Sequence, residues 1–124
     1  MVFLWIIVKY AIFIIKFLDI ILKEFFIYIL YSEKSQIYYV GYTSDIKKRI
    51  IQHNDLSENS FTSKHRPWIL KALFEVNGTE ADAMQIENFI KKQKSSKFIE
   101  RIIATETPFF GVLAQLIRVP KLRD

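Results

Sequence analysis

The 124-residue chain contains no cysteine. This absence excludes disulfide bonds and thiolate metal sites, and it is typical of proteins of the reducing cytoplasm. A metal ion in this chain must therefore be held by oxygen or imidazole ligands, which favours magnesium or manganese over structural zinc. The expected location is the cytoplasm, including the inner face of the membrane.

The chain also lacks internal repeats, low-complexity tracts and a recognisable zinc finger or helix–turn–helix. At this length it should form one domain with a modest core. Its net charge of +5 and pI of about 9.4 favour a polyanionic partner, either nucleic acid or a membrane surface. Three lysines and one aspartate lie in residues 1–23, so the remainder carries +3 and should bind DNA weakly and in a salt-sensitive manner.

Residues 2–22 form a hydrophobic run that no small-residue cleavage site follows, which argues against a secretory signal peptide. The run is long enough to span a bilayer, but Lys9 and Lys16 lie well inside it. With Lys23 they recur every seven residues, as one polar stripe would require. Three interpretations stay open: a membrane-associated helix, a hydrophobic helix packed on the domain, or a leader read from a misplaced start codon.

Strand and helix patterns alternate after this run. Residues 24–31 and 36–42 are rich in β-branched and aromatic side chains and predict a hairpin, and residues 68–76 predict a third strand. Helices are predicted over residues 45–54, 79–94, 97–104 and 109–119.

Local signals support three of these helices. Ser44 is a favourable N-cap for the first, and Thr79 with Asp82 forms a capping-box-like pair before the second. The last predicted helix is an apolar stretch bracketed by Pro108 and Pro120. The predicted fold class is α+β, with a small three-stranded antiparallel sheet flanked by helices and preceded by an extra hydrophobic N-terminal helix. We expect a helix over residues 1–23, a core domain over 24–104, and a helical C-terminal extension over 105–124.

The hairpin carries two tyrosines, Tyr28 and Tyr39, one on each arm, and Gly41 follows the second. Tyrosines suit half-buried strands for structural reasons alone, so a functional pair requires that both phenols converge on one pocket. Gly41 either relaxes the strand end or lets a phosphate approach the backbone closely.

Arg49 and His53 are four residues apart on a predicted helix and therefore share one face. Together they offer a guanidinium for phosphate oxygens and a titratable ring. The structural alternative is a solvated arginine and a histidine that interacts with the helix dipole.

Glu87 lies at the margin of the apolar face of the predicted helix 79–94. Such a carboxylate is either an exposed helix former or a ligand for a hard cation. The lysines that follow it form either a solvated face or a track for a phosphate backbone. The predicted nucleic-acid contacts are Lys48, Lys64, Arg66, Lys91 and Lys94.

The order Phe26-Ile27-Tyr28, then Tyr39-Val40-Gly41, then Arg49, His53 and Glu87 resembles the GIY-YIG nuclease family, particularly its small single-domain bacterial members. The resemblance covers about residues 25–104. It implies a compact three-stranded domain that cuts DNA phosphodiester bonds with one divalent metal, Mg²⁺ or Mn²⁺.

By this resemblance Glu87 would bind the metal, and Tyr28 and Tyr39 would flank the scissile phosphate, one of them helping to activate water. Arg49 would stabilise the developing negative charge, and His53 would assist proton transfer or position a tyrosine. A tyrosine has an ordinary pKa near 10, so a role as base at neutral pH requires help from the metal, Arg49 or His53.

Two departures from the family pattern stand out. Phe26 replaces the glycine of the family name, and residues 95–104 lack the asparagine that several members carry on the last core helix. With no second DNA-binding module, sequence specificity should be low or supplied by a partner.

The favoured hypothesis is a metal-dependent DNA endonuclease with no small-molecule cofactor, acting in repair or on branched, damaged or single-stranded DNA. The alternatives are a non-catalytic nucleic-acid-binding domain of the same fold and a membrane-associated protein whose basic face meets anionic lipid.

Overall fold

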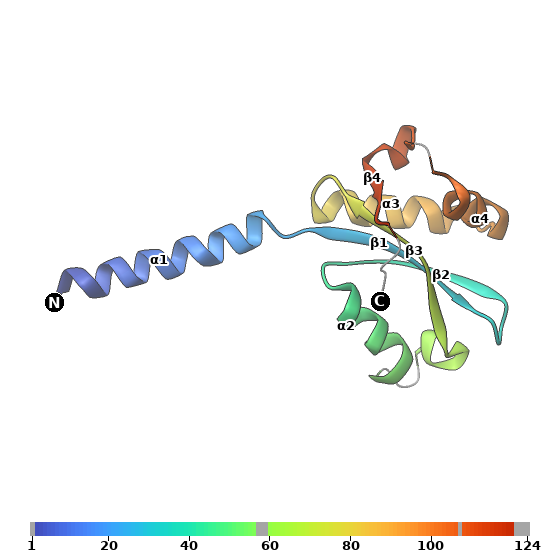
Figure 1. The fold of residues 1–124 in the computed structure, drawn as a ribbon, viewed down its shortest axis with the longest axis horizontal. Helices are drawn as coiled ribbons and strands as arrows, with labels where there is room; N and C mark the ends of the chain where they lie inside the picture. Colours follow the sequence, from blue (N-terminus) through green and yellow to red (C-terminus); the bar gives the residue numbers. More distant parts are fainter. Residues whose placement is uncertain (1, 57–59, 107, 121–124) are drawn as a thin grey trace.

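A four-stranded antiparallel sheet is the centre of the molecule, in a computed structural model that describes residues 2–56, 60–106 and 108–120 (Figure 1). The strand order is β2-β1-β3-β4, so β2 forms one edge. The strands are β1 (Phe25–Ser32), β2 (Ile37–Thr43), β3 (Trp68–Val76) and β4 (Leu116–Arg118). The α+β fold class and all three predicted strands are confirmed, but the prediction of a three-stranded sheet is wrong by one strand.

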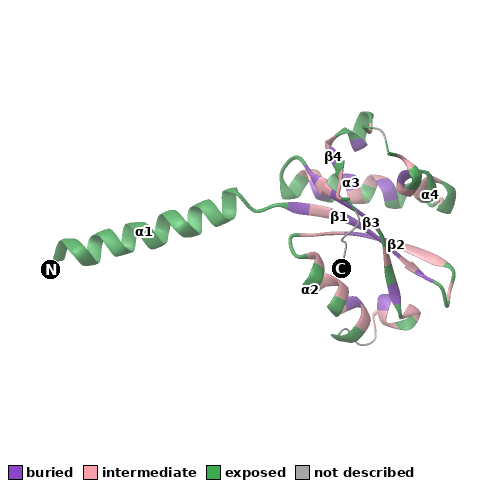
Figure 2. Ribbon diagram, viewed as in Figure 1, coloured by how far each residue is buried: buried purple, intermediate pink, exposed green. Residues whose placement is uncertain are grey.

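Both faces of the sheet are covered, because alternate residues of β1 belong to two separate cores. Ile27 and Ile29 pack with residues of α3 (Glu80–Lys92) and α4 (Ser96–Ala104). Tyr28 and Leu30 pack on the opposite face against Trp68 and against α2 (Ile46–Ile51). The sheet is therefore the middle of three layers, with α2 on one side and α3 and α4 on the other (Figures 1 and 2).

Local capping signals place most helix ends. Thr79 and Asp82 form the predicted capping box at the start of α3, with both reciprocal hydrogen bonds present. Ser95 caps α4 by accepting a hydrogen bond from Phe98 N. The predicted N-cap Ser44 is wrong by one residue, because the Asp45 side chain accepts from Lys48 N and caps α2.

The chain continues past α2 as a π-helical turn, η1 (Gln52–Leu56), and a short 3₁₀ helix, η2 (Thr62–His65), precedes β3. These turns lie between the middle of the helix predicted over residues 45–54 and the start of the strand predicted over residues 68–76. The π-helical geometry falls on Gln52 and His53, which both belong to the site described below.

The C-terminal segment does not form the helix predicted over residues 109–119. It forms a 3₁₀ helix, η3 (Gly111–Gln115), and then β4, which pairs with Phe74–Val76 of β3. Gly111 adopts φ +66, which an α-helix does not allow, and the exposed edge of β3 offers hydrogen bonds to an extended segment. Arg118 of β4 then donates to the carbonyls of Ile102 and Ile103 at 2.8 and 2.7 Å, at the end of α4.

The N-terminal helix α1 (Val2–Ile21) confirms the predicted hydrophobic helix, but every one of its residues is exposed (Figure 2). The interpretation in which it packs on the domain is therefore wrong. None of the helices in the described part of the chain combines the length and apolarity needed to cross a bilayer.

Candidate active site

A hollow of about 620 Å³ lies beside the edge strand β2, where side chains from β1, β2, α2 and α3 meet. Because β2 is an edge strand, groups from both helical layers reach this place. The hollow is lined by Tyr28, Tyr39, Gly41, Arg49 and Glu87, among others. The geometry therefore brings both phenols, the guanidinium and the acidic side chain to one cavity.

The Tyr28 hydroxyl is the centre of a buried hydrogen-bond network. It lies 2.8 Å from Nε2 of His53 and accepts a hydrogen bond of 3.1 Å from Nε of Arg49. Arg49 is held from its other side, because its Nη1 donates to Oε1 of Gln52 at 3.0 Å. Tyr28 and His53 are both buried, so these groups are held in fixed positions below the hollow.

Gly41 makes this arrangement possible. It pairs with Tyr28 across the hairpin, and a Cβ atom at position 41 would lie 2.2 Å from the Tyr28 hydroxyl oxygen. Any side chain at this position would displace the hydroxyl from Arg49 and His53. Of the two interpretations of Gly41, close approach is the one that the structure supports, but the group that approaches is the Tyr28 phenol.

Burial sets the protonation states in the network. It raises the pKa of Tyr28 to about 12, although the neighbouring Arg49 acts in the opposite direction. Burial, together with the positive charges of Arg49 and Arg66, lowers the pKa of His53 to about 4. At neutral pH His53 is uncharged, and in the tautomer whose Nε2 carries no proton this nitrogen accepts the hydrogen bond from the Tyr28 hydroxyl.

Arg49 links the two tyrosines. Its hydrogen bond to Tyr28 raises its pKa, burial acts in the opposite direction, and the nearby Tyr39 adds to the increase. Tyr39 is half-buried, with its ring 5.0 Å from the His53 ring and 6.3 Å from the Tyr28 ring, centroid to centroid. The guanidinium is therefore permanently charged beside two phenols.

Glu87 extends from α3 into the same hollow, and Oε1 accepts a hydrogen bond of 2.9 Å from Nζ of Lys91, one helical turn later. The Lys91 ammonium also lies 5.3 Å from the centroid of the Tyr39 ring. Glu80 lines the hollow as well and accepts a hydrogen bond from the Tyr42 hydroxyl at 3.2 Å. These contacts were not predicted from the sequence, although the i,i+4 spacing of Glu87 and Lys91 is a signal that predicts such a pair.

The donor set fits one kind of metal site. No group of three or more His, Asp or Glu side chains converges on a point within residues 2–56, 60–106 and 108–120. Mg²⁺ is commonly bound through one or two carboxylates, with water and substrate phosphate completing its octahedron. Glu87 in an open, water-accessible hollow fits a site of this kind and does not fit an all-protein cage.

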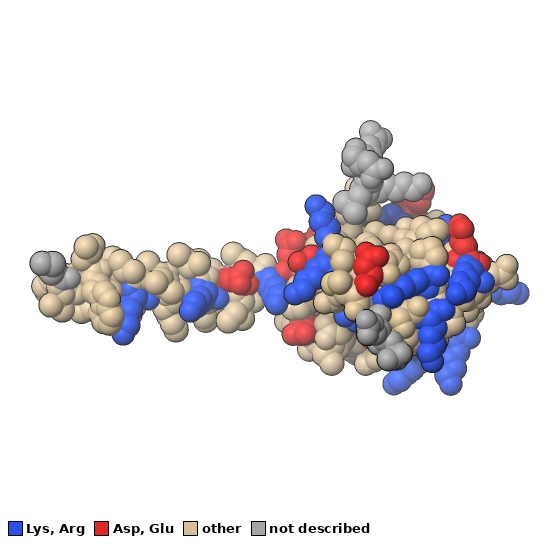
Figure 3. All heavy atoms as spheres, turned by 90° about the horizontal axis from the view of Figure 1, so that it is seen from below, with Lys and Arg blue, Asp and Glu red and all other residues tan. Residues whose placement is uncertain are grey.

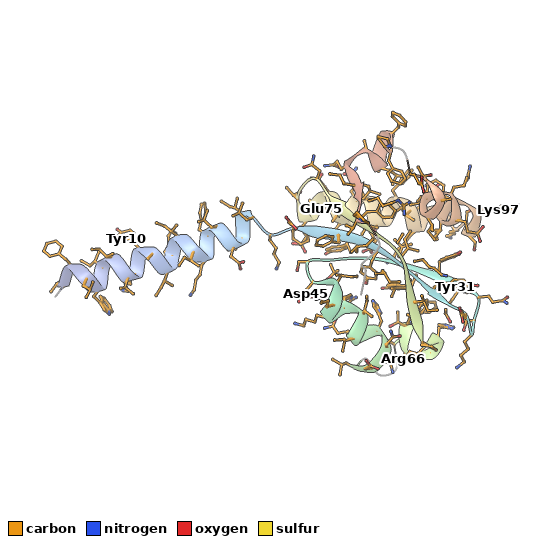
Figure 4. The ribbon with its side chains drawn as sticks, in the orientation of Figure 1. Tyr10, Tyr31, Asp45, Arg66, Glu75 and Lys97 are labelled. Atoms are coloured by element: carbon orange, nitrogen blue, oxygen red, sulfur yellow. The ribbon has the colours of Figure 1, made fainter. Side chains whose placement is uncertain are left out.

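The five predicted nucleic-acid contacts do not form one group. Lys48 lines the main hollow, and Lys91 and Lys94 line a neighbouring hollow of about 360 Å³. Lys64 is exposed on η2. Arg66 lies on the α2 side of the sheet (Figure 4), where its Nε donates to the His53 carbonyl at 2.7 Å, so it supports the His53 backbone.

Basic side chains gather on one part of the domain surface with acidic ones between them (Figure 3). Such a mixed surface agrees with the small net charge of the domain and differs from a continuous basic groove. It favours weak, salt-dependent attraction of a polyanion.

Comparison with known proteins identifies one family model and two relatives that match most of the domain. A family model described as the GIY-YIG catalytic domain matches residues 24–100. The UPF0213 protein YazA of Bacillus subtilis is 37% identical over 71 residues, which cover 54% of this chain and 70% of that protein. The structure-specific endonuclease subunit SLX1 of the yeast Meyerozyma guilliermondii is 35% identical over 80 residues, which cover 60% of this chain but 27% of the yeast protein.

Proposed function

The chain belongs to the GIY-YIG nuclease family, and we propose on this premise that it is a divalent-metal-dependent endonuclease that hydrolyses DNA phosphodiester bonds. One observation supports this function above the others. A buried tyrosine, hydrogen-bonded to an arginine and to a neutral histidine, lines the same hollow as a carboxylate from the opposite layer.

Proton transfer is the first task of these residues. In our proposal, the Tyr28 hydroxyl takes a proton from the attacking water while it gives its own proton to Nε2 of His53. The low pKa of His53 keeps its ring unprotonated at neutral pH, so in this step it accepts the proton only transiently and releases it to solvent afterwards, and the high pKa of Tyr28 means that no free phenolate accumulates. Arg49 stabilises the transient negative charge on the phenol because its Nε already donates to that oxygen.

Charge stabilisation is the second task. Arg49 would bind a non-bridging phosphate oxygen, and Tyr39, which lines the same hollow, would position the phosphate. Glu87 would hold Mg²⁺ or Mn²⁺, which when bound supplies a Lewis acid for the phosphate oxygens. The water oxygen forms a bond to phosphorus as the bond to the leaving oxygen breaks, and the leaving oxygen takes a proton from solvent.

The decisive experiment is a plasmid-nicking assay with Mg²⁺ or Mn²⁺ on the parent chain and on Glu87→Gln and Arg49→Ala. We expect both variants to lose nicking while their circular dichroism spectra stay unchanged. Glu33→Gln is the matched control, because Glu33 is an exposed carboxylate in the hairpin turn. The Glu33→Gln variant should nick plasmid DNA at the parent rate. Cleavage by Glu87→Gln at the parent rate would refute the metal assignment.

A non-catalytic DNA-binding domain is a second candidate, and one observation favours it. The Glu87 carboxylate is engaged by the Lys91 ammonium, which shares the negative charge that a metal requires. DNA binding without nicking at any Mg²⁺ or Mn²⁺ concentration would support this candidate over the enzyme.

The substrate that we propose is branched, damaged or single-stranded DNA, in a repair or processing role. The relative from Meyerozyma guilliermondii is named as a structure-specific endonuclease subunit, and this supports the choice. Cleavage rates on a flap, a nicked duplex and an intact duplex of the same sequence test it. Equal rates on all three would contradict it.

Association of α1 with an anionic membrane surface is a separate proposal. Its support is the exposure of the apolar side chains of α1, together with Lys9 and Lys16 on one stripe. Flotation of the full chain with phosphatidylserine vesicles should be reduced in a Lys9→Glu/Lys16→Glu variant. Unchanged flotation would contradict a role for these lysines, without bearing on the nuclease.

A further inference from the structure

Phe61 is an exposed aromatic residue at the rim of the active site. Its side chain is 56% exposed, although aromatic rings of this size are usually largely buried. The ring lies 6.4 Å from the Tyr39 ring at an interplanar angle of 29°, and 4.7 Å from the His65 ring, centroid to centroid. Phe61 is therefore held beside a proposed catalytic tyrosine while part of its surface faces solvent.

Two hollows flank this ring, and Tyr39 and Phe61 line both of them. One, of about 480 Å³, is also lined by Arg49, Gln52 and His53. The other, of about 360 Å³, is also lined by Lys91 and Lys94. Phe61 and Tyr39 thus form an aromatic ridge between two hollows, each of which contains positive charge.

A nucleotide matches this combination of groups. Its base offers a flat π-face of the kind that stacks on aromatic side chains, and its phosphate offers the negative charge that Arg49 and the lysines attract. Arg49 lines both the main hollow and the larger flanking hollow, so a phosphate held by it has its own base within reach of the ridge.

Base pairing decides which nucleotides can use the ridge. In a continuous duplex both faces of each base are covered by neighbouring pairs, whereas an unpaired base is free to stack on protein. An apolar peptide side chain would fill the ring contact but would leave the positive charges of both hollows without a counterpart. The ridge therefore favours a nucleic acid with unpaired nucleotides.

We propose that Phe61 stacks on an unpaired nucleobase next to the scissile phosphate, and that this contact makes the site prefer DNA with a single-stranded segment at the point of cleavage. This inference rests on the proposed function and assigns a substrate feature to the same site. Phe61 acts here in binding and takes no part in proton transfer.

The test measures binding of the full chain to two DNA probes in buffer with EDTA, which prevents cleavage. One probe is a continuous duplex, and the other is the same duplex with a short single-stranded gap that contains 2-aminopurine, a base whose fluorescence falls when it stacks. We expect the parent chain to bind the gapped probe more tightly and to quench its fluorescence further. Phe61→Ala should weaken binding to the gapped probe by about tenfold, with little effect on the duplex.

Two further variants separate stacking from a general disturbance. Phe61→Trp keeps a stacking ring and should keep both the affinity and the quenching. Phe110→Ala removes a phenylalanine that is 86% exposed and lines neither flanking hollow, and it should change nothing. Thermal melting of each variant establishes that the fold is retained.

The remaining outcomes would refute either the stacking role of Phe61 or the proposed nuclease function. Equal losses by Phe61→Ala on both probes, or no loss on the gapped probe, would refute stacking on an unpaired base and leave the proposed function intact. Failure of the parent chain to bind either probe would refute DNA as the partner, and with it the proposed function.

Discussion

The two faces of strand β1 differ in what they bury. Toward α3 and α4 the buried residues are all hydrophobic, with Ile27 and Ile29 from the strand and Ile86 and Ile90 from α3. Toward α2 the strand instead presents Tyr28, whose hydroxyl binds the buried His53. One strand therefore contributes to a hydrophobic core on each face, and only the core toward α2, which also holds Leu30, includes the polar network of Tyr28.

This difference indicates a division of work between the layers. Apolar burial toward α3 stabilises the fold, at roughly 25 cal/mol for each Å² removed from water. The polar groups toward α2 must be fully hydrogen-bonded to be tolerated, and within the described residues no buried side-chain polar atom lacks a partner. The α2 layer therefore contains the residues proposed for proton transfer, and the α3 layer supplies a hydrophobic core together with the proposed metal ligand Glu87.

Tyr28→Phe should disrupt the polar network and should have the largest effect on nicking of the changes to the two faces of β1. It removes the hydroxyl that is hydrogen-bonded to His53 and accepts from Arg49, so nicking should fall by about 10²- to 10⁴-fold, the usual contribution of general acid–base catalysis. The free energy of unfolding should fall by about 1–3 kcal/mol, because two partners lose a buried hydrogen bond. Plasmid nicking and urea denaturation measure the two effects.

Tyr31→Phe is the matched control for that change, because Tyr31 lies on the same strand and lines none of the three hollows around Tyr39 (Figure 4). It should leave nicking unchanged. Equal activity of Tyr28→Phe and Tyr31→Phe would show that the Tyr28 hydroxyl does not take part in the reaction.

Ile86→Ala should damage the apolar face and leave the chemistry untouched. Ile86 is 1% exposed in the core between α3 and the sheet, so its truncation should cost about 2–5 kcal/mol in the free energy of unfolding. The nicking rate per folded molecule should be unchanged where the variant is folded. Met84→Ala, at a 46% exposed position of the same helix, should cost much less, and equal costs would contradict the assignment of the core.

Sequence reasoning succeeded where local signals decide the structure. The capping box of Thr79 and Asp82 and the β-branched hairpin arms are properties of a few neighbouring residues, and the structure has them as predicted. The convergence of Tyr28, Tyr39, Arg49 and Glu87 on one hollow followed from a family pattern, since no local signal reports which layer a side chain enters.

The failures came from non-local contacts. An apolar stretch between two prolines is compatible with a helix, and its pairing with the free edge of β3 depends on a strand more than 35 residues earlier. The burial of Tyr28 similarly depends on Gly41 across the hairpin and on the π-helical turn that carries His53. Phe61, too, gave no local signal that distinguishes an exposed ring from a core residue.

The pH dependence of stability should sharpen the contrast between the two faces. The pKa of His53 is lowered to about 4 in the folded chain from an ordinary value of 6.5, so the unfolded state binds more protons between these values. The contribution of His53 to stability is therefore complete above about pH 6.5 and is lost as the pH falls toward 4. Urea denaturation across this range should show a decline that is smaller in His53→Gln, and identical pH profiles would contradict a buried, neutral His53.

Lys91→Met tests the ion pair between Lys91 and Glu87. This pair lies beside the edge strand β2, where groups from both helical layers meet. The methionine keeps the aliphatic length over Tyr39 but removes the ammonium that binds Glu87 Oε1. A partly exposed ion pair contributes about 0.5–1 kcal/mol, so its loss should tighten Mn²⁺ binding about two- to fivefold. Titration of Mn²⁺ followed by electron paramagnetic resonance measures this directly and does not depend on catalysis.

The same change should weaken DNA binding and reduce its salt dependence, because Lys91 is also a predicted phosphate contact. Lys92→Met is the matched control, because Lys92 is an exposed lysine of the same helix and lines neither the main hollow nor either flanking hollow. This variant should keep the parent affinities for Mn²⁺ and for DNA. Mn²⁺ affinity that is the same in both variants would mean that Lys91 does not compete for Glu87. A gain in metal affinity without loss of DNA affinity would mean that Lys91 pairs with the Glu87 carboxylate and does not contact DNA. Lys94 would then be the first of the predicted lysine contacts after Glu87.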